Sequence, residues 1–174
     1  MKYRPIPFFR PTHWGAERLY RIVKDYAGLC GNETVLDLYS GTGTIAIYLS
    51  GSAKAVIGLE IVASAVMDAD NNCRLNRISN CRFIQGDIKN SLSQINVRPE
   101  VMIIDPPRAG IHKDIIKQII AMAPDRMVYV SCNPATMARD LSMLKDHYAV
   151  LEVQPMDMFP HTFHIEAVAR LEKR

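Results

Sequence analysis

Five apolar segments alternate with stretches of helical length, and this alternation constrains the fold more than any other feature of the sequence. The segments are rich in Val and Ile and run continuously apolar, as parallel strands buried on both faces do. They span residues 34–39, 54–60, 81–85, 101–105 and 127–131. The helix-length stretches between them cover about residues 43–50, 62–77, 111–122 and 134–145. The pattern predicts an α/β fold with helices on both faces of a mostly parallel sheet.

The two ends of the chain depart from this alternation. Residues 12–29 carry apolar side chains at helical spacing and predict an amphipathic helix before the first strand. Residues 148–154 and 163–171 are both strand-like, and no helical segment separates them. Strands joined without a crossover helix pair antiparallel. We therefore expect an antiparallel pair at a sheet edge, which brings the predicted number of strands to seven.

The composition limits the class of protein. The 174 residues include 21 Lys and Arg against 18 Asp and Glu, so the formal charge of +3 permits an anionic partner without identifying one. No apolar run approaches the roughly 20 residues of a membrane span, and the four cysteines show neither C-x-x-C spacing nor, with the histidines, the spacing of a zinc site. We expect one domain over residues 1–174, no metal, no membrane contact, reduced thiols and a cytoplasmic location.

Acidic residues and a glycine turn mark the carboxyl ends of the first three strands. Asp37 lies near the end of the first strand, before a turn containing Gly41 and Gly43, while Glu60 ends the second and Asp87 follows the third. Ligands of open α/β sheets bind at this edge. Carboxylates repel a pyrophosphate but suit a ribose diol and a sulfonium cation, which favours S-adenosylmethionine over NAD. For any one acid alone, a solvated strand end or a helix N-cap is the simpler interpretation.

Two further strand ends carry reactive groups. Asp105 closes the fourth strand, and the two prolines after it restrict the backbone, leaving Asp105 and Arg108 at the same edge. Cys132 follows the fifth strand and precedes a helix whose N-terminal amides favour a thiolate. We predict that Cys132 is a nucleophile. The other three cysteines lack such a setting and are expected to be ordinary core or surface residues.

The last predicted strand contains Glu166 among apolar neighbours, on the same face as His164. A buried carboxylate costs free energy unless it is used or paired. Burial also raises the pKa of a carboxyl group toward the range useful for proton transfer, so Glu166 is a candidate base. The alternative is a carboxylate in water at the sheet edge, with His161 and His164 as surface histidines.

Taken together, these residues resemble the catalytic domain of the S-adenosylmethionine-dependent RNA uracil-C5 methyltransferases, which make 5-methyluridine in tRNA and 23S rRNA. The resemblance runs from about residue 8 to the C-terminus. The segments that carry it are 37–44 (DLYSGTGT), 58–60 (GLE), 105–110 (DPPRAG), 131–134 (SCNP) and 157–166 (DMFPHTFHIE). The last three, in this order, are specific, whereas the glycine turn fits any methyltransferase of this fold.

The resemblance implies a Rossmann-like class I methyltransferase fold and an enzyme that methylates C5 of uridine in tRNA or rRNA through a covalent cysteine adduct. It implies that Cys132 is the nucleophile and Glu166 the base. The residues expected around S-adenosylmethionine and the target base are Tyr39, Gly41, Gly43, Thr44, Glu60, Asp87 and Asp105.

The chain departs from the family pattern in two respects. Where members show Phe-x-Gln-x-Asn before the first helix, residues 8–12 are FFRPT, so Arg10 replaces the Gln. We expect Arg10 to contact a phosphate or the cofactor carboxylate, with a plain surface role as the alternative. Members also carry an oligonucleotide-binding-like domain and a central region that grip RNA. We expect both to be absent from this chain.

Three other functions compete with this interpretation. A nitrogen methyltransferase of the same fold typically has an acid or Asn followed by Pro-Pro and an aromatic residue; here Arg108 stands in that place, and such an enzyme has no use for Cys132. A cytosine-C5 enzyme places its Cys where this chain has Pro107. The remaining alternative is an incomplete domain that only binds the cofactor. Cys132 and Glu166 argue against it, whereas the expected absence of the RNA-gripping parts argues for it.

Overall fold

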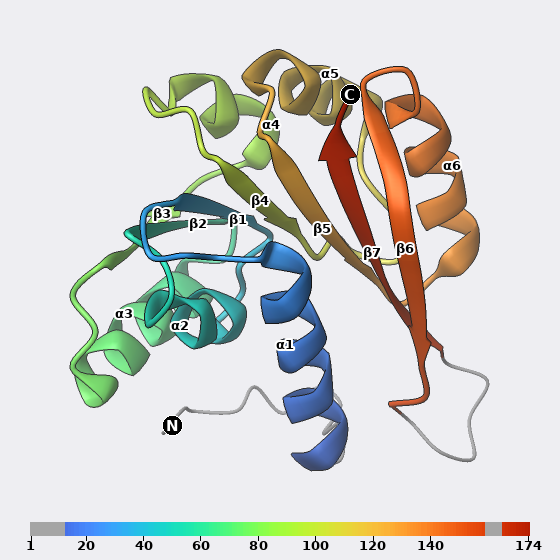
Figure 1. Ribbon diagram of the computed structural model, residues 1–174. Coiled ribbons are helices and arrows are strands. Elements are labelled where there is room, and N and C mark those ends of the chain that lie inside the picture. The colour runs from blue at the N-terminus through green and yellow to red at the C-terminus, as the bar shows by residue number, and fades with distance from the viewer. Residues whose placement is uncertain (1–12, 159–164) are drawn as a thin grey trace.

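The computed structural model describes residues 13–158 and 165–174 (Figure 1). Its helices are α1 (His13–Ala27), α2 (Thr44–Ser50), α3 (Ala63–Asn76), α4 (Ile88–Ser91), α5 (Lys113–Met122) and α6 (Pro134–Leu144), with a 3-10 turn at Leu92–Gln94. Its strands are β1 (Thr34–Leu38), β2 (Ala55–Glu60), β3 (Cys81–Gln85), β4 (Val101–Ile104), β5 (Arg126–Ser131), β6 (Tyr148–Met156) and β7 (Glu166–Lys173). None of these helices is both long enough and apolar enough to cross a membrane.

The seven strands form one sheet in the order β3-β2-β1-β4-β5-β7-β6. Strands β1 to β5 are parallel to one another, because each connection between them crosses over through a helix or a long loop. Strand β7 lies antiparallel between β5 and β6. The predicted mostly parallel sheet with an antiparallel C-terminal pair at one edge is therefore confirmed.

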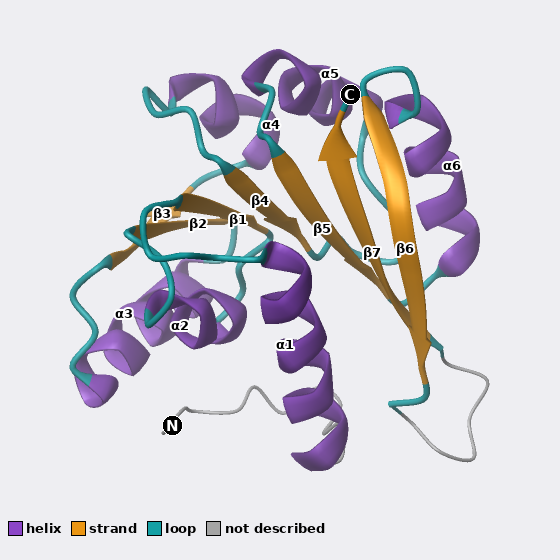
Figure 2. Ribbon diagram, in the orientation of Figure 1, coloured by secondary structure: helices purple, strands orange, loops and turns teal. Residues whose placement is uncertain are grey.

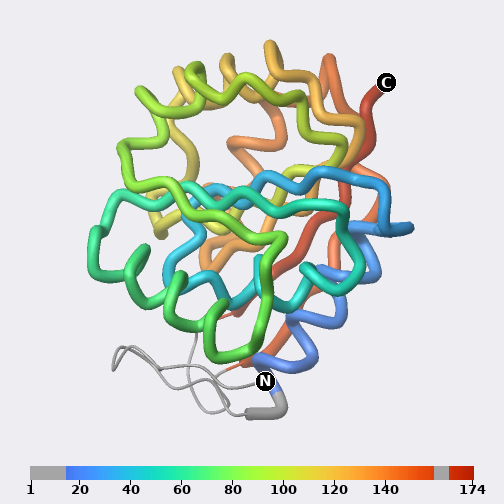
Figure 3. The backbone as a smooth tube through the Cα atoms, turned by 90° about the vertical axis from the view of Figure 1, so that its left-hand side faces the viewer, coloured from blue at the N-terminus to red at the C-terminus, as the bar shows by residue number. Residues whose placement is uncertain are grey.

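Helices cover both faces of the sheet. Helices α1, α2 and α3 lie on one face, and α4, α5 and α6 lie on the other (Figure 2). The tube in Figure 3, seen after a 90° turn, shows the same two layers above and below the strands. The middle of the sheet holds the core: all four residues of β4 are buried, with at most 1% of their surface exposed. Each such side chain contributes roughly 1.5–3 kcal/mol by leaving water.

The structure differs from the sequence expectation in three elements. The single-turn helix α4 was not predicted, because four residues are too few to show a helical period. Strand β3 is not buried on both faces: it lies at the sheet edge, and Arg82 and Gln85 are exposed. Strand β6 extends to Met156 through Pro155. Proline is tolerated there because β6 is an edge strand, with a neighbouring strand on one side only.

This topology gathers the chemistry-bearing residues at one edge. The carboxyl ends of β1 to β5 all lie at this edge, and β7, which runs in the opposite direction, begins there. Residues that directly follow the parallel strands and residues at the start of β7 therefore meet. Apart from Arg10, which lies outside the described residues, the predicted site residues occupy or directly adjoin those positions along the chain.

Candidate active site

The turn after β1 has the backbone that a closely bound ligand needs. Gly41 and Gly43 have φ of 53° and 76°, in the left-handed region that favours glycine. A Cβ on Gly43 would lie 2.5 Å from the ring of Phe83, so glycine is required there. A Cβ on Gly41 would meet nothing within 4 Å. The turn is thus packed against the protein at Gly43 and open at Gly41, where a ligand can lie against the backbone.

Glu60, at the end of β2, is fixed beside this turn. Its Oε2 accepts a hydrogen bond from the amide of Gly41 at 2.9 Å, and its Oε1 accepts one from the amide of Val62 at 2.8 Å. Each carboxylate oxygen has a further lone pair. Glu60 therefore joins the two loops and still has acceptor capacity for ligand hydroxyl groups.

Asp37 lies within β1 beneath the turn and is 1% exposed. Burial raises the pKa of Asp37 well above its usual range, and the nearby charge of Asp105 raises it further. The backbone amide of Ala46 opposes this shift, yet neither carboxyl oxygen has a hydrogen-bond partner among the residues that the structure describes. A buried carboxyl group without a partner is rare in native proteins. Because Asp37 is buried and its raised pKa favours the neutral form, it belongs to the support of the turn, and Glu60 carries the acceptor capacity that faces a ligand.

Asp87 and Tyr39 border the same region. Asp87 caps α4, and its Oδ1 accepts a hydrogen bond from the amide of Lys89 at 2.9 Å, so the N-cap role considered for it is present. Burial, with the charges of Asp140 and Asp87, raises the pKa of Tyr39 to about 12, which keeps the phenol neutral. Thr44 is the first residue of α2.

Cys132 and Glu166 lie together on the neighbouring part of the edge. The β5–β7 ladder ends with the pair Ser131 and Ala167, so Cys132 and Glu166 are the next residue on each strand. Cys132 is half-buried, and Asn133 directly after it caps α6 by accepting the amide of Ala135 at 3.1 Å. The two residues predicted from separate motifs are thus brought to one end of one strand pair.

Asp105 and Arg108, which follow β4, form the third side of this group. Burial raises the pKa of Glu166, and the Arg108 guanidinium opposes that shift. Asp105 is exposed to solvent at the carboxyl end of β4. Protein atoms nevertheless surround its carboxyl group on the other sides. This crowding raises the pKa of Asp105 to about 7, and the Glu166 carboxylate adds to the shift. The Glu166 carboxylate therefore lies close enough to disfavour a second negative charge on Asp105.

Asp105→Asn is expected to make the free energy of unfolding less dependent on pH. The pKa of Asp105 in the folded state, about 7, lies above its ordinary value of 3.8, so the folded state binds this proton more tightly. The stability that results is fully present below about pH 4 and is lost as the pH rises through about 7. Urea unfolding at several pH values should show a decline for the wild type that the variant lacks. Parallel curves for the two proteins would contradict the assignment.

Two groups near the site, Asp37 and Arg108, were not among the predicted site residues. Asp37 was noted as an acid in an apolar strand, and its complete burial is the signal that marks it. Arg108 was noted only as a charge beside two prolines. Arg10, proposed from the departure in the first segment, lies outside the described residues, as do His161 and His164.

Comparison with known proteins identifies the family of this chain. The family described as tRNA (uracil-5-)-methyltransferase matches residues 16–174. A protein of Bacteroides thetaiotaomicron, named as an uncharacterized RNA methyltransferase, is 51% identical over 177 residues, which cover 99% of this chain and 39% of that protein. The chain thus spans about two fifths of the length of this relative.

Two solved structures resemble this chain in fold. The tRNA (uracil-54, C5)-methyltransferase of Pyrococcus abyssi, in complex with S-adenosyl-L-homocysteine, is 38% identical with a TM-score of 0.82, covering 94% of this chain and 40% of that one. A precorrin-6y C5,15-methyltransferase from Geobacter metallireducens has a TM-score of 0.77 at 11% identity, over 98% of this chain and 94% of that one. The second likeness concerns the fold alone, which is that of class I methyltransferases.

Proposed function

The chain belongs to the tRNA (uracil-5-)-methyltransferase family, and on this premise we propose that it transfers a methyl group from S-adenosylmethionine to C5 of a uridine in tRNA or rRNA. The observation that carries the proposal is the meeting of Cys132 and Glu166 one residue beyond the last pair of the β5–β7 ladder. A thiol and a carboxyl group at one point are the two groups that this reaction needs.

The residues around the turn after β1 are proposed to hold the cofactor. Glu60 has free acceptor capacity for the ribose diol, while Asp37, buried beneath the turn, supports the backbone on which the ligand lies. The open side of Gly41 gives the ligand room against the backbone. When bound, S-adenosylmethionine supplies an electrophilic methyl group on a sulfonium. Arg10 remains a candidate for its carboxylate.

The chain's own residues explain how a poor nucleophile becomes reactive. C5 of uracil is a weak nucleophile, so the Cys132 thiolate adds to C6 and moves the C5=C6 electron pair onto C5 and the carbonyl as an enolate. Once C5 has been methylated, the Glu166 carboxylate removes the C5 proton. The electron pair of that C–H bond re-forms C5=C6, and the C6–S bond breaks to release the thiolate. The target base must leave its stack for this chemistry.

Glu60→Gln is expected to weaken the binding of S-adenosylhomocysteine about 10-fold or more, because a hydrogen bond to a charged group contributes about 1.5–3 kcal/mol. Isothermal titration calorimetry on the full chain measures the change. Glu33→Gln is the matched control: Glu33 also accepts backbone amides, those of Cys30, Gly31 and Asn32, but precedes β1 at the opposite end of the strand. Equal losses in both variants would contradict a cofactor role for Glu60.

The identity of the methylated nucleoside tests the reaction itself. We expect 5-methyluridine when the chain, labelled S-adenosylmethionine and unmodified tRNA and rRNA are incubated and the RNA is digested to nucleosides. A nucleoside methylated on nitrogen would instead support the nitrogen methyltransferase alternative. Cofactor binding without any RNA methylation would support a cofactor-binding domain that needs parts outside these residues.

A further inference from the structure

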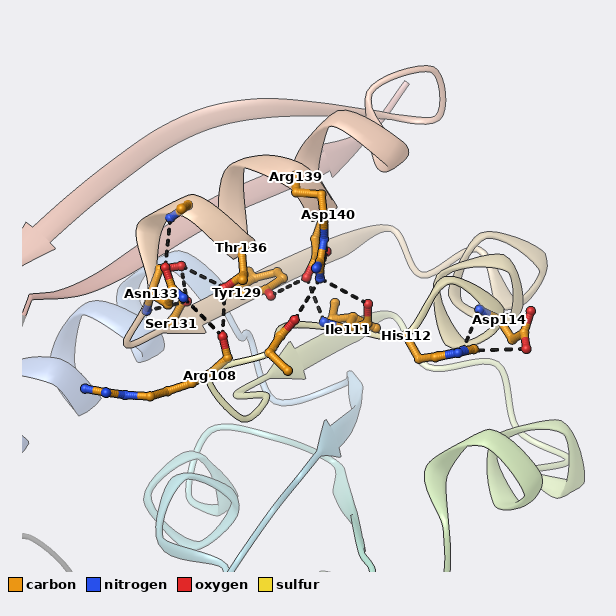
Figure 4. Close-up of polar contacts among 12 residues, drawn as sticks. Arg108, Ile111, His112, Asp114, Tyr129, Ser131, Asn133, Thr136, Arg139 and Asp140 are labelled. Carbon is orange, nitrogen blue, oxygen red and sulfur yellow. Dashed lines mark hydrogen bonds and ion pairs between the residues drawn. The ribbon is translucent and has the colours of Figure 1, made fainter.

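The loop that follows β4 is fastened to helix α6 by side chains of the helix. The carbonyl of Arg108 accepts hydrogen bonds from Asn133 Nδ2 and Thr136 Oγ1, both at 3.2 Å. The carbonyl of Ala109 accepts one from Arg139 Nη2 at 2.9 Å. Figure 4 shows these α6 side chains gathered over the loop. The helix therefore fixes the path of the backbone that carries Arg108.

Asp140 is the centre of this arrangement. Its side chain is fully buried, and its Oδ2 accepts hydrogen bonds from the amide of Ile111 at 2.7 Å and from the hydroxyl of Tyr129 at 2.8 Å. Its Oδ1 accepts two from Arg139, at 2.8 Å through Nε and 2.7 Å through Nη2. All four acceptor positions of the carboxylate are thus used. These hydrogen bonds offset the free energy lost when the charged carboxylate is removed from water.

The loop is built to approach this carboxylate closely. Gly110 has φ of 76°, and a Cβ there would lie 2.5 Å from Asp140 Oδ2 and 2.6 Å from Arg139 Nη2. Any other residue would push the loop away from the helix. Pro106 and Pro107 restrict the backbone before the contact. The loop therefore has one well-defined path against α6.

The held loop lies beside the groups proposed for the reaction, because β4 neighbours β5 in the sheet. The side chain of Arg108 extends away from the α6 contacts (Figure 4), and its charge acts on Glu166. On the helix side, Asn133 binds the Arg108 carbonyl and immediately follows Cys132. A shift of the loop would thus change the placement of Arg108 relative to both Glu166 and Cys132.

We propose that Tyr129, Asp140 and Thr136 are positioning residues, which hold the β4–α5 loop on α6 so that Arg108 stays in place beside Glu166 during methyl transfer. The proposal rests on the uridine-C5 function proposed above and assigns these residues a role in its rate. None of them is proposed to contact the reacting atoms. Burying the charged Asp140 carboxylate costs free energy, and the role proposed here for Asp140 is that it fixes the loop.

Tyr129→Phe and Thr136→Val test the proposal, with Tyr148→Phe as a matched control. Tyr148 is also buried and also donates one hydrogen bond, at 3.0 Å, but to the carbonyl of Pro124, which belongs neither to the loop nor to α6. We expect each test variant to lower kcat about 10-fold, the effect of one lost hydrogen bond of roughly 1.4 kcal/mol. The Kd for S-adenosylhomocysteine should stay unchanged, and amide exchange at Ile111 should quicken.

The control should lower the unfolding temperature while leaving kcat and the exchange at Ile111 as in the wild type. Unchanged kcat or unchanged exchange at Ile111 in the test variants would overturn the proposal, as would an equal fall in kcat for Tyr148→Phe. A wild-type chain that methylates no uridine would instead reject the proposed function. The two failures are distinguishable, because the second appears before any variant is compared.

Discussion

Cys132→Ala is expected to abolish methyl transfer to RNA, with a fall in rate of about 10⁴-fold or more, as seen when covalent nucleophiles are removed. Without a thiolate to add at C6, C5 of uracil does not become nucleophilic. The affinity for S-adenosylhomocysteine should not change, because the residues proposed to bind it lie at the ends of β1 and β2. Single-turnover transfer of labelled methyl and calorimetric titration measure the two quantities.

Cys30→Ala is the control for the loss of a thiol. Cys30 is exposed and precedes β1, at the end of the strand opposite to the proposed site. We expect full activity from this variant. A Cys132→Ala protein that keeps a tenth or more of the wild-type rate would contradict the covalent mechanism, since that residual rate is far above what the loss of a nucleophile leaves.

Glu166→Gln is expected to stop the reaction at a later point. The thiolate can still add to C6 and C5 can still be methylated, but no carboxylate removes the C5 proton, so the covalent protein–RNA adduct should accumulate. We expect the turnover rate to fall about 10²–10⁴-fold, the usual contribution of a general base. Denaturing gel electrophoresis with labelled RNA, in the presence of S-adenosylmethionine, detects the adduct.

The double variant Cys132→Ala, Glu166→Gln separates this result from non-specific crosslinking. It should form no adduct, because the bond to RNA is made by the Cys132 sulfur. An adduct in the double variant would show attachment elsewhere on the chain. Slow turnover of Glu166→Gln without any adduct would contradict its assignment as the base and would turn attention to Asp105, whose pKa burial raises to about 7.

Much of the architecture was predictable from the pattern of apolar residues. Continuous apolar runs identified the central strands, because β4 and β5 are buried on both faces. The position of Cys132 directly after one of these strands identified it as a candidate. The sequence was a poorer guide to β3 and α4. Strand β3 is partly solvated, and α4 is a single turn that begins at the Asp87 cap. Local signals are weak wherever burial is incomplete.

The contacts within the site were less predictable, because they depend on how distant segments pack. The Glu166 charge acts on Asp105 because β7 inserts between β5 and β6, an order that the sequence does not dictate. The bond from the Ile111 amide to Asp140 joins residues 29 apart. One sequence signal for Asp140 exists: it occupies the buried face of α6 with Met137 and Leu144, where an apolar residue would be expected.

Release of tritium from RNA that contains 5-³H-uridine tests the central claim most directly. Methylation at C5 requires the C5 hydrogen to leave, so the account predicts that one tritium enters water for each methyl group transferred, after correction for any isotope effect. Cys132→Ala should release none. Methyl transfer without tritium release would place the methyl group on another atom and would contradict uridine-C5 methylation by this chain.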